Sequence, residues 1–179
     1  GKAFGFCATS VPGYCGIDWR RSIFWSKERY FLFLDRLTAV QPGDYTLRVH
    51  WRTPGKGKLK GTGFMVEQQA RPAPDAQSPP DRIDTFRLIC CGADKASLDL
   101  DTENVGKWFE PYPYTDALAS IVQQGRTMAM ASGDAHTFVN LFFVSNAAHP
   151  VQADMRQLCE GVVIVRDGDR LACLGIGPK

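Results

Sequence analysis

The stretch Asp44-Tyr45-Thr46-Leu47-Arg48-Val49-His50-Trp51-Arg52 alternates strictly between polar and apolar side chains. An extended strand places its apolar members on one face and its polar members on the other. One buried face and one solvated face are typical of a strand in an antiparallel sheet. The residues just before it, Gln41-Pro42-Gly43, are a strong turn signal, so the strand has a defined start.

The segments on the N-terminal side of this stretch carry the same signal. In Ile17–Trp25 the side chains of Ile17, Trp19, Ile23 and Trp25 share a face. The run Arg29–Asp35 is apolar on both faces, as expected for a central strand.

Further strands are predicted along the rest of the chain, at 63–69, 82–91, 96–101, 118–124, 126–131, 137–145, 161–166 and 170–174. The last two form a hairpin with Asp167-Gly168 at its turn. Residues 150–158 are expected to hold one or two helical turns. Two stretches rich in proline, 70–82 and 102–115, are expected to be irregular surface loops.

Together these segments predict an all-β protein, an antiparallel two-sheet β-sandwich of about ten strands. A length of 179 residues fits one domain, so residues 1–179 are expected to form a single sandwich. The core is expected to contain Trp25, Phe33, Leu34, Leu47, Val49, Leu141 and Phe143.

Composition and motifs exclude several classes of function. A net charge of +2 gives no reason to expect nucleic acid or an anionic membrane as a partner. No apolar run is long enough to span a bilayer, and the N-terminus does not read as a signal peptide. No phosphate-binding glycine motif and no Gly-x-Ser-x-Gly elbow are present. The six cysteines form no C-x-x-C pair, so neither a zinc knuckle nor a thioredoxin-like motif is expected. No metal and no cofactor are predicted, and free buried thiols are favoured over disulfides.

Three groups of residues offer chemistry. His50 lies on the polar face of its strand between Arg48 and Arg52, where it is either a solvated histidine or a group that contacts a ligand. Asp134 and His136 offer at most two metal ligands. The segment 108–114 carries Trp108, Phe109, Tyr112 and Tyr114, which would either stack on sugar rings or plug the core.

The runs Trp19–Trp25, Tyr30-Phe31 to Asp35, and His50-Trp51 resemble the β-sheet domain of heparinase II/III-like proteins. The resemblance implies a large sandwich that follows a helical toroid, the part that supplies the catalytic tyrosine of a polysaccharide lyase. This chain shows no such toroid, so it is expected to be a fragment of a longer protein. The family is usually exported, which implies an extracellular or periplasmic location.

The first hypothesis is therefore a non-catalytic sandwich domain of a polysaccharide-lyase-related protein, not an enzyme on its own. Its expected partners are a polysaccharide or oligosaccharide and the helical domain of the parent protein. The expected ligand-binding residues are Arg20, Arg48, His50, Arg52, Trp108 and Tyr112. The alternative is a free-standing carbohydrate-binding module, and a complete enzyme lacks an adequate acid–base set. A large exposed apolar patch favours the first hypothesis, because it marks a missing partner domain.

Overall fold

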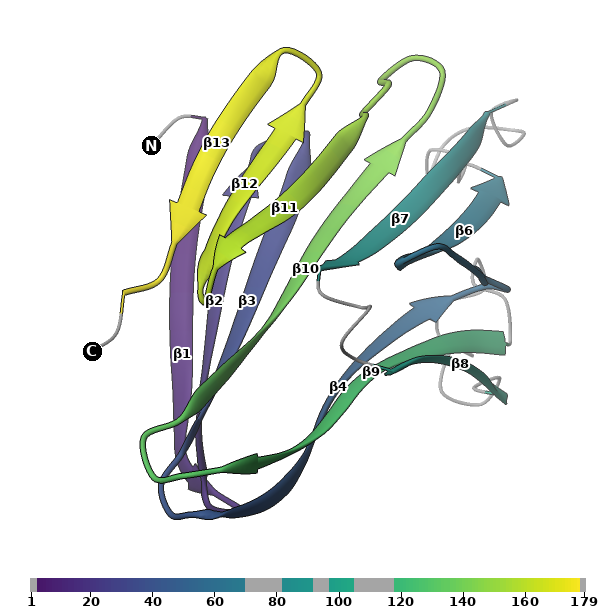
Figure 1. Cartoon of the computed structure of the whole chain (residues 1–179). Coiled ribbons are helices and arrows are strands. Elements are labelled where there is room, and N and C mark those ends of the chain that lie inside the picture. The colour runs from purple at the N-terminus through teal and green to yellow at the C-terminus, as the bar shows by residue number, and fades with distance from the viewer. Residues whose placement is uncertain (1–2, 70–81, 92–96, 105–117, 178–179) are drawn as a thin grey trace.

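The computed structural model describes residues 3–69, 82–91, 97–104 and 118–177, and within them it contains strands and no helix (Figure 1). The strands of these ranges number thirteen, and every pairing between them is antiparallel. The all-β prediction is thus confirmed, with more strands than the sequence suggested. None of the described segments forms a helix long and apolar enough to cross a membrane.

Seven strands form the largest sheet, which we call the central sheet. Their order is β1 (Phe4–Tyr14), β2 (Ile17–Ser26), β3 (Tyr30–Ala39), β10 (Ala135–Ser145), β7 (Ile83–Cys91), β6 (Gly63–Gln69) and β5 (Lys58–Lys60).

Two smaller sheets of three strands each complete the fold. The first consists of β11 (Ala153–Cys159), β12 (Val162–Asp167) and β13 (Arg170–Gly175). The second consists of β4 (Gly43–Pro54), β9 (Leu118–Met130) and β8 (Ser97–Asn104).

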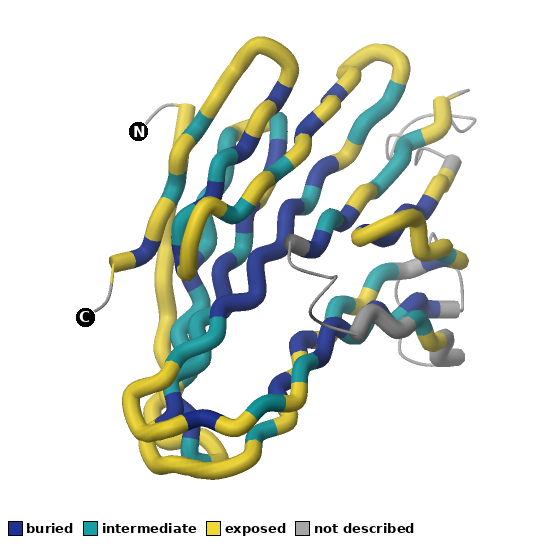
Figure 2. The backbone as a smooth tube through the Cα atoms, in the orientation of Figure 1, coloured by how far each residue is buried: buried dark blue, intermediate teal, exposed yellow. Residues whose placement is uncertain are grey.

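The two small sheets pack on opposite faces of the central sheet. Along β10, Val139 and Leu141 belong to the same core cluster as Val163 of the β11–β13 sheet. Phe138 instead packs with Leu47, which belongs to the β4–β9–β8 sheet. Because alternate side chains of a strand point to opposite faces, β10 is buried on both sides, as the dark blue of Figure 2 shows. The predicted antiparallel sandwich is therefore confirmed, and the structure adds a detail: its strands are divided among three sheets rather than two.

Three local predictions are corrected by the structure. Residues 118–124 and 126–131 form one strand, β9, which continues through Gly125 because that glycine pairs with both Arg48 and Ser97. The predicted helical turns at 150–158 are wrong, since β11 occupies most of this stretch. Strand β8 continues to Asn104, into the predicted loop at 102–115, and the remaining predicted loop residues, 70–81 and 105–115, lie outside the described residues.

Five of the seven predicted core side chains are buried: Leu34, Leu47, Val49, Leu141 and Phe143. Trp25 and Phe33 are only half-buried, because the β4–β9–β8 sheet leaves part of this face of the central sheet uncovered. Cys90 is buried as expected, but the prediction of buried thiols is wrong for Cys7, Cys15, Cys159 and Cys173, which are free and exposed.

Two buried carboxylates each hold an arginine, one between two sheets and one within the central sheet. Asp167 of β12 accepts two hydrogen bonds from the Arg29 guanidinium, at 2.7 and 2.6 Å, which ties the β11–β13 sheet to the β2–β3 turn. Asp35 accepts 2.7 and 2.9 Å bonds from Arg21, and a 2.9 Å bond from the indole Nε1 of Trp19. Both carboxylates are almost fully buried, so each depends on its arginine.

Candidate functional site

A row of polar side chains crosses four strands of the central sheet. Arg20 of β2 pairs directly with Arg36 of β3, with Ser10 of β1 beyond Arg20 and Thr137 of β10 beyond Arg36. Directly opposed residues of antiparallel strands project on the same face. This is the face on which the β11–β13 sheet packs, since Leu34, two residues from Arg36, lies in that core cluster.

The β2–β3 turn sets the strand register that places Arg20 directly opposite Arg36. Ser26 pairs with Tyr30 across the three residues 27–29, and counting back along both strands brings Arg20 opposite Arg36. Glu28 takes a positive φ of 64°, as three-residue hairpin loops require at one position. Arg36 was not among the predicted ligand residues. The short turn predicted at 26–28 could have indicated it, because the length of the turn sets the register that brings Arg36 opposite Arg20.

Arg20 and Arg36 are half-buried, yet neither forms an ion pair with a carboxylate in the part of the chain that the structure describes. The neighbouring Arg21 and Arg29 both hold buried carboxylates in two-point contacts. Like charges directly opposite each other on adjacent strands are destabilising. The pair is therefore an unneutralised positive charge in the middle of a sheet face.

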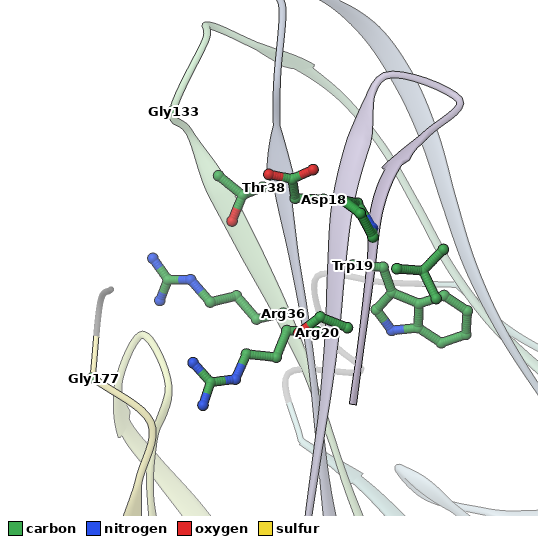
Figure 3. A pocket seen from close by; sticks show the side chains of 10 residues that line it. Asp18, Trp19, Arg20, Arg36, Thr38, Gly133 and Gly177 are labelled. Carbon is green, nitrogen blue, oxygen red and sulfur yellow. The ribbon is translucent and has the colours of Figure 1, made fainter. Parts of the chain in front are cut away.

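The two arginines lie in a pocket of about 550 Å³. Ser10, Pro12, Asp18 and Thr38 also line it, together with Gly133 of the β9–β10 turn and Gly177 after β13. In Figure 3 the Arg20 and Arg36 side chains point to the same side, toward the chain at Gly177, whereas Trp19 points away from them. This volume is in the usual range for small-molecule sites.

Asp18 and Thr38 form the other end of this pocket. They oppose each other on β2 and β3, two residues along from the arginine pair, so all four side chains share one face. One Asp18 oxygen accepts a 2.8 Å hydrogen bond from the backbone N–H of Gly13, which fixes the carboxylate. Gly13 has φ of 66°, a conformation that glycine adopts without strain. The pocket thus has a cationic end and an end that accepts hydrogen bonds.

The predicted ligand residues do not form one site. Arg48, His50 and Arg52 are exposed on the outer face of β4, the face away from the central sheet. Arg20 faces the opposite side of the molecule, in the pocket. Trp108 and Tyr112 lie outside the described residues.

The remaining titratable candidates are poorly placed for acid–base chemistry. His136 is half-buried against Phe138, and burial, with the nearby charge of Arg126, lowers its pKa below the usual 6.5. Tyr30 is buried, and burial with the charge of Asp167 raises its pKa. Within the described ranges, no group of three side chains is arranged to hold a metal ion.

Aromatic and apolar side chains line the opposite face of the central sheet, at the margin of the β4–β9–β8 sheet, where Phe142 still contacts Trp51 of β4. We call Trp25, Phe31, Phe86, Phe142 and Val144 the aromatic face. Trp25 stacks on Phe31 at 6.5 Å between ring centroids, and Phe86 lies 5.7 Å from Phe142. Phe31 and Val144 remain 49% and 50% exposed. The four strands β2, β3, β10 and β7 thus present a continuous apolar surface.

A groove of about 320 Å³ runs along part of the aromatic face, lined by Phe31, Phe86, Phe142 and Val144. On the β1 side of the aromatic face the Trp25 ring lies over Gly5, and a Cβ at that position would clash with the ring. The glycine therefore allows the apolar surface to extend toward the edge of the sheet.

Comparisons with known proteins give matches among solved structures. No family model matches the chain, and no curated protein matches it. A heparinase III structure, the BT4657 gene product, has a TM-score of 0.64 at 15% identity, covering 96% of this chain and 25% of its own. A mutant of the heparan sulfate lyase HepC from Pedobacter heparinus gives 0.64 at 14% identity, with 98% and 26% covered. A further structure of heparinase III gives 0.63 at 11% identity, with 96% and 25% covered.

The chain therefore spans about a quarter of the length of these lyases. At such low identities the likeness concerns the fold, and it confirms at that level the resemblance seen in the sequence. The chain adopts the antiparallel β-sandwich fold found in the matching quarter of heparinase III structures.

Proposed function

We propose that this chain is a non-catalytic β-sandwich domain of a polysaccharide-lyase-related protein. In this proposal it contributes to polysaccharide binding, and its aromatic face packs against the helical domain of the same protein. The observation that carries the proposal is the partly uncovered aromatic face, on which Phe31 and Val144 are half exposed. Contiguous exposed apolar surface of this kind is typical of an interface.

The fold comparison supports the same interpretation. In the solved lyases, the matched part is about a quarter of the chain, and the other three quarters lie outside the match. A domain of this fold that presents aromatic side chains on one sheet face has the surface that a second domain would cover. Apolar burial stabilises such contacts by about 25 cal/mol for each Å² removed from water.

The placement of titratable groups supports the absence of lyase activity from this chain alone. β-Elimination from a uronic acid needs a base for the C5 proton, an acid for the leaving oxygen, and positive charge near the carboxylate. The arginine pocket offers positive charge, but Tyr30 is buried away from it and His50 lies on the outer face of β4. Losing one member of a concerted catalytic set typically removes several orders of magnitude in rate.

A free-standing carbohydrate-binding module is the second candidate, and one observation favours it. The pocket of Arg20 and Arg36 and the aromatic face lie on opposite sides of the central sheet. The pocket would therefore stay open to a sugar whether or not another domain covers the aromatic face.

The test is a lyase assay of the isolated chain on heparan sulfate and alginate, followed by absorbance of the unsaturated product. We expect no turnover, together with binding of a dye that reports exposed apolar surface. The matched variant Phe31→Ser should lower the dye signal, because it removes the most exposed ring of the aromatic face. Robust turnover that disappears in His50→Ala would contradict the proposal and show that the sandwich carries its own active site.

An extracellular or periplasmic location belongs to the proposal and rests on the resemblance. The exposed thiols of Cys7 and Cys15 provide a test, because a maleimide that cannot cross membranes should label them in intact cells of the native host. Labelling that needs broken cells would place the protein in the cytoplasm.

A further inference from the structure

The charge of the arginine pair needs a counter-ion that the described residues do not supply. Arg20 and Arg36 face each other across neighbouring strands, which lie about 4.7–4.9 Å apart in a sheet. An arginine remains charged at any ordinary pH, so the pair cannot relieve its repulsion by losing a proton. A bound anion would turn this unfavourable contact into two favourable ones.

The side chains in the row match the oxygens of an acidic group. Each guanidinium offers a planar fork of N–H donors, which binds carboxylate and sulfate oxygens in two-point contacts. The Ser10 hydroxyl lines the pocket beside Arg20. On the other side of the pair, Thr137 continues the row but is buried and does not line the pocket. The pocket thus has donors on both arginines and a hydroxyl beside them on Ser10.

The end of the pocket with Asp18 and Thr38 restricts the ligand further. A carboxylate fixed by the Gly13 N–H accepts hydrogen bonds but repels a second anionic group. Successive side chains on one face of a strand are about 6.6–6.8 Å apart, so this acceptor is about one sugar ring from the arginines. A sugar with one acidic group and free hydroxyls suits both ends, whereas a small polyanion would meet Asp18.

We propose that the pocket of Arg20 and Arg36 binds one acidic group, a carboxylate or a sulfate, of an acidic polysaccharide, with sugar hydroxyls donating to Asp18. The proposal rests on the proposed function, because the polysaccharide is the ligand assigned to the whole domain. It adds a site, a chemical class of ligand and an orientation. The predicted Arg48, His50 and Arg52 have no part in it.

The experiment compares two variants that lose the same charge. Arg36→Gln removes one guanidinium from the pocket, and the control Arg48→Gln removes one from the exposed outer face of β4. Affinities for heparan sulfate and alginate oligosaccharides are measured by calorimetry at fixed ionic strength, since surface charge responds to salt. We expect Arg36→Gln to weaken binding about tenfold or more, the usual loss for a hydrogen-bonded charge, and Arg48→Gln to change it less than about twofold.

A second readout uses small anions alone. Sodium sulfate and sodium glucuronate should raise the melting temperature of the wild type more than that of Arg36→Gln, because a ligand of the folded state stabilises it. Sodium chloride at equal ionic strength is the reference for each. Sulfate also stabilises folded proteins without binding them, so the signal is the part of the rise that Arg36→Gln removes. A larger part with sulfate than with glucuronate identifies a sulfate site, and the reverse order identifies a carboxylate site.

The outcomes separate the two proposals. If Arg36→Gln weakens oligosaccharide binding and Arg48→Gln does not, the result supports both the proposed function and the pocket. Binding that neither variant weakens overturns the pocket and leaves the proposed function standing. A specific rise with sulfate or glucuronate, without any oligosaccharide binding, overturns polysaccharide binding but supports the pocket as an anion site. No response in either measurement overturns the pocket and the polysaccharide-binding part of the proposed function.

Discussion

Replacing Asp35 by Asn tests the buried ion pair that joins β2 to β3. The carboxylate is fully buried and accepts three hydrogen bonds, two from Arg21 and one from Trp19. The guanidinium also lies 4.9 Å from the centroid of the Trp51 ring, so it is held between aromatic surfaces. Asparagine keeps one acceptor oxygen but presents N–H donors where Asp35 Oδ2 faced Arg21, so two donors would meet.

The size of the effect follows from this geometry. One charge-assisted hydrogen bond is lost, which costs about 1.5–3 kcal/mol. Breaking a fully buried pair costs about 3–5 kcal/mol, but the Arg21 side chain is 25% exposed, so water recovers part of that penalty. We expect Asp35→Asn to lower the free energy of unfolding by about 2–4 kcal/mol.

Urea denaturation followed by circular dichroism measures this change. Asp44→Asn, which alters an exposed aspartate on β4, is the matched control and should cost less than about 0.5 kcal/mol. The double variant Arg21→Met with Asp35→Leu should be more stable than Asp35→Asn, because it leaves no unpaired charge. A loss under about 1 kcal/mol in Asp35→Asn would refute the reasoning, since the pair would then contribute no more than a surface contact.

Three further predictions concern the core, the pH dependence of stability, and the attachment of the β11–β13 sheet. Leu141→Ala should cost about 2–5 kcal/mol in urea denaturation, because Leu141 is fully buried, while Leu171→Ala, at a 66% exposed site, should cost under about 0.5 kcal/mol. Burial lowers the pKa of His136 from 6.5, so the unfolded chain binds the proton more readily; stability should fall as pH drops below 6.5 toward that lowered pKa, and His136→Gln should remove this slope. Asp167→Asn should cost about 2–3 kcal/mol by breaking its contact with Arg29, and should speed hydrogen exchange in β12 more than in β4; equal exchange in both strands would contradict this.

The sequence predicted the fold class because its strands are buried on at least one side. In residues 44–52 the alternation marks the inner face of β4, and Leu47 and Val49 are buried as expected. Strand β1 was not predicted, because it is a sheet edge and nearly all of its side chains are exposed, which leaves no apolar periodicity (Figure 2). The third layer was not predicted for a related reason. The apolar pattern of β10 indicates that both faces of the strand are buried, but it does not identify the elements that cover each face.

The candidate site was harder to predict than the fold. Arg20 was expected to bind a ligand, but its partner Arg36 depends on strand register, which residue types alone do not determine. Arg48 and Arg52 were grouped with Arg20 by charge, although the layering places them on the opposite side of the molecule. Trp108 and Tyr112 remain predictions, because they lie outside the described residues.

The most direct test of the central claim is a crystal structure of the domain with a heparan sulfate or alginate oligosaccharide. Our account predicts an uncleaved sugar with one acidic group between the guanidinium groups of Arg20 and Arg36, and a sugar hydroxyl within hydrogen-bonding distance of Asp18. An oligosaccharide bound along the outer face of β4, or one cleaved at a site within this chain, would contradict it.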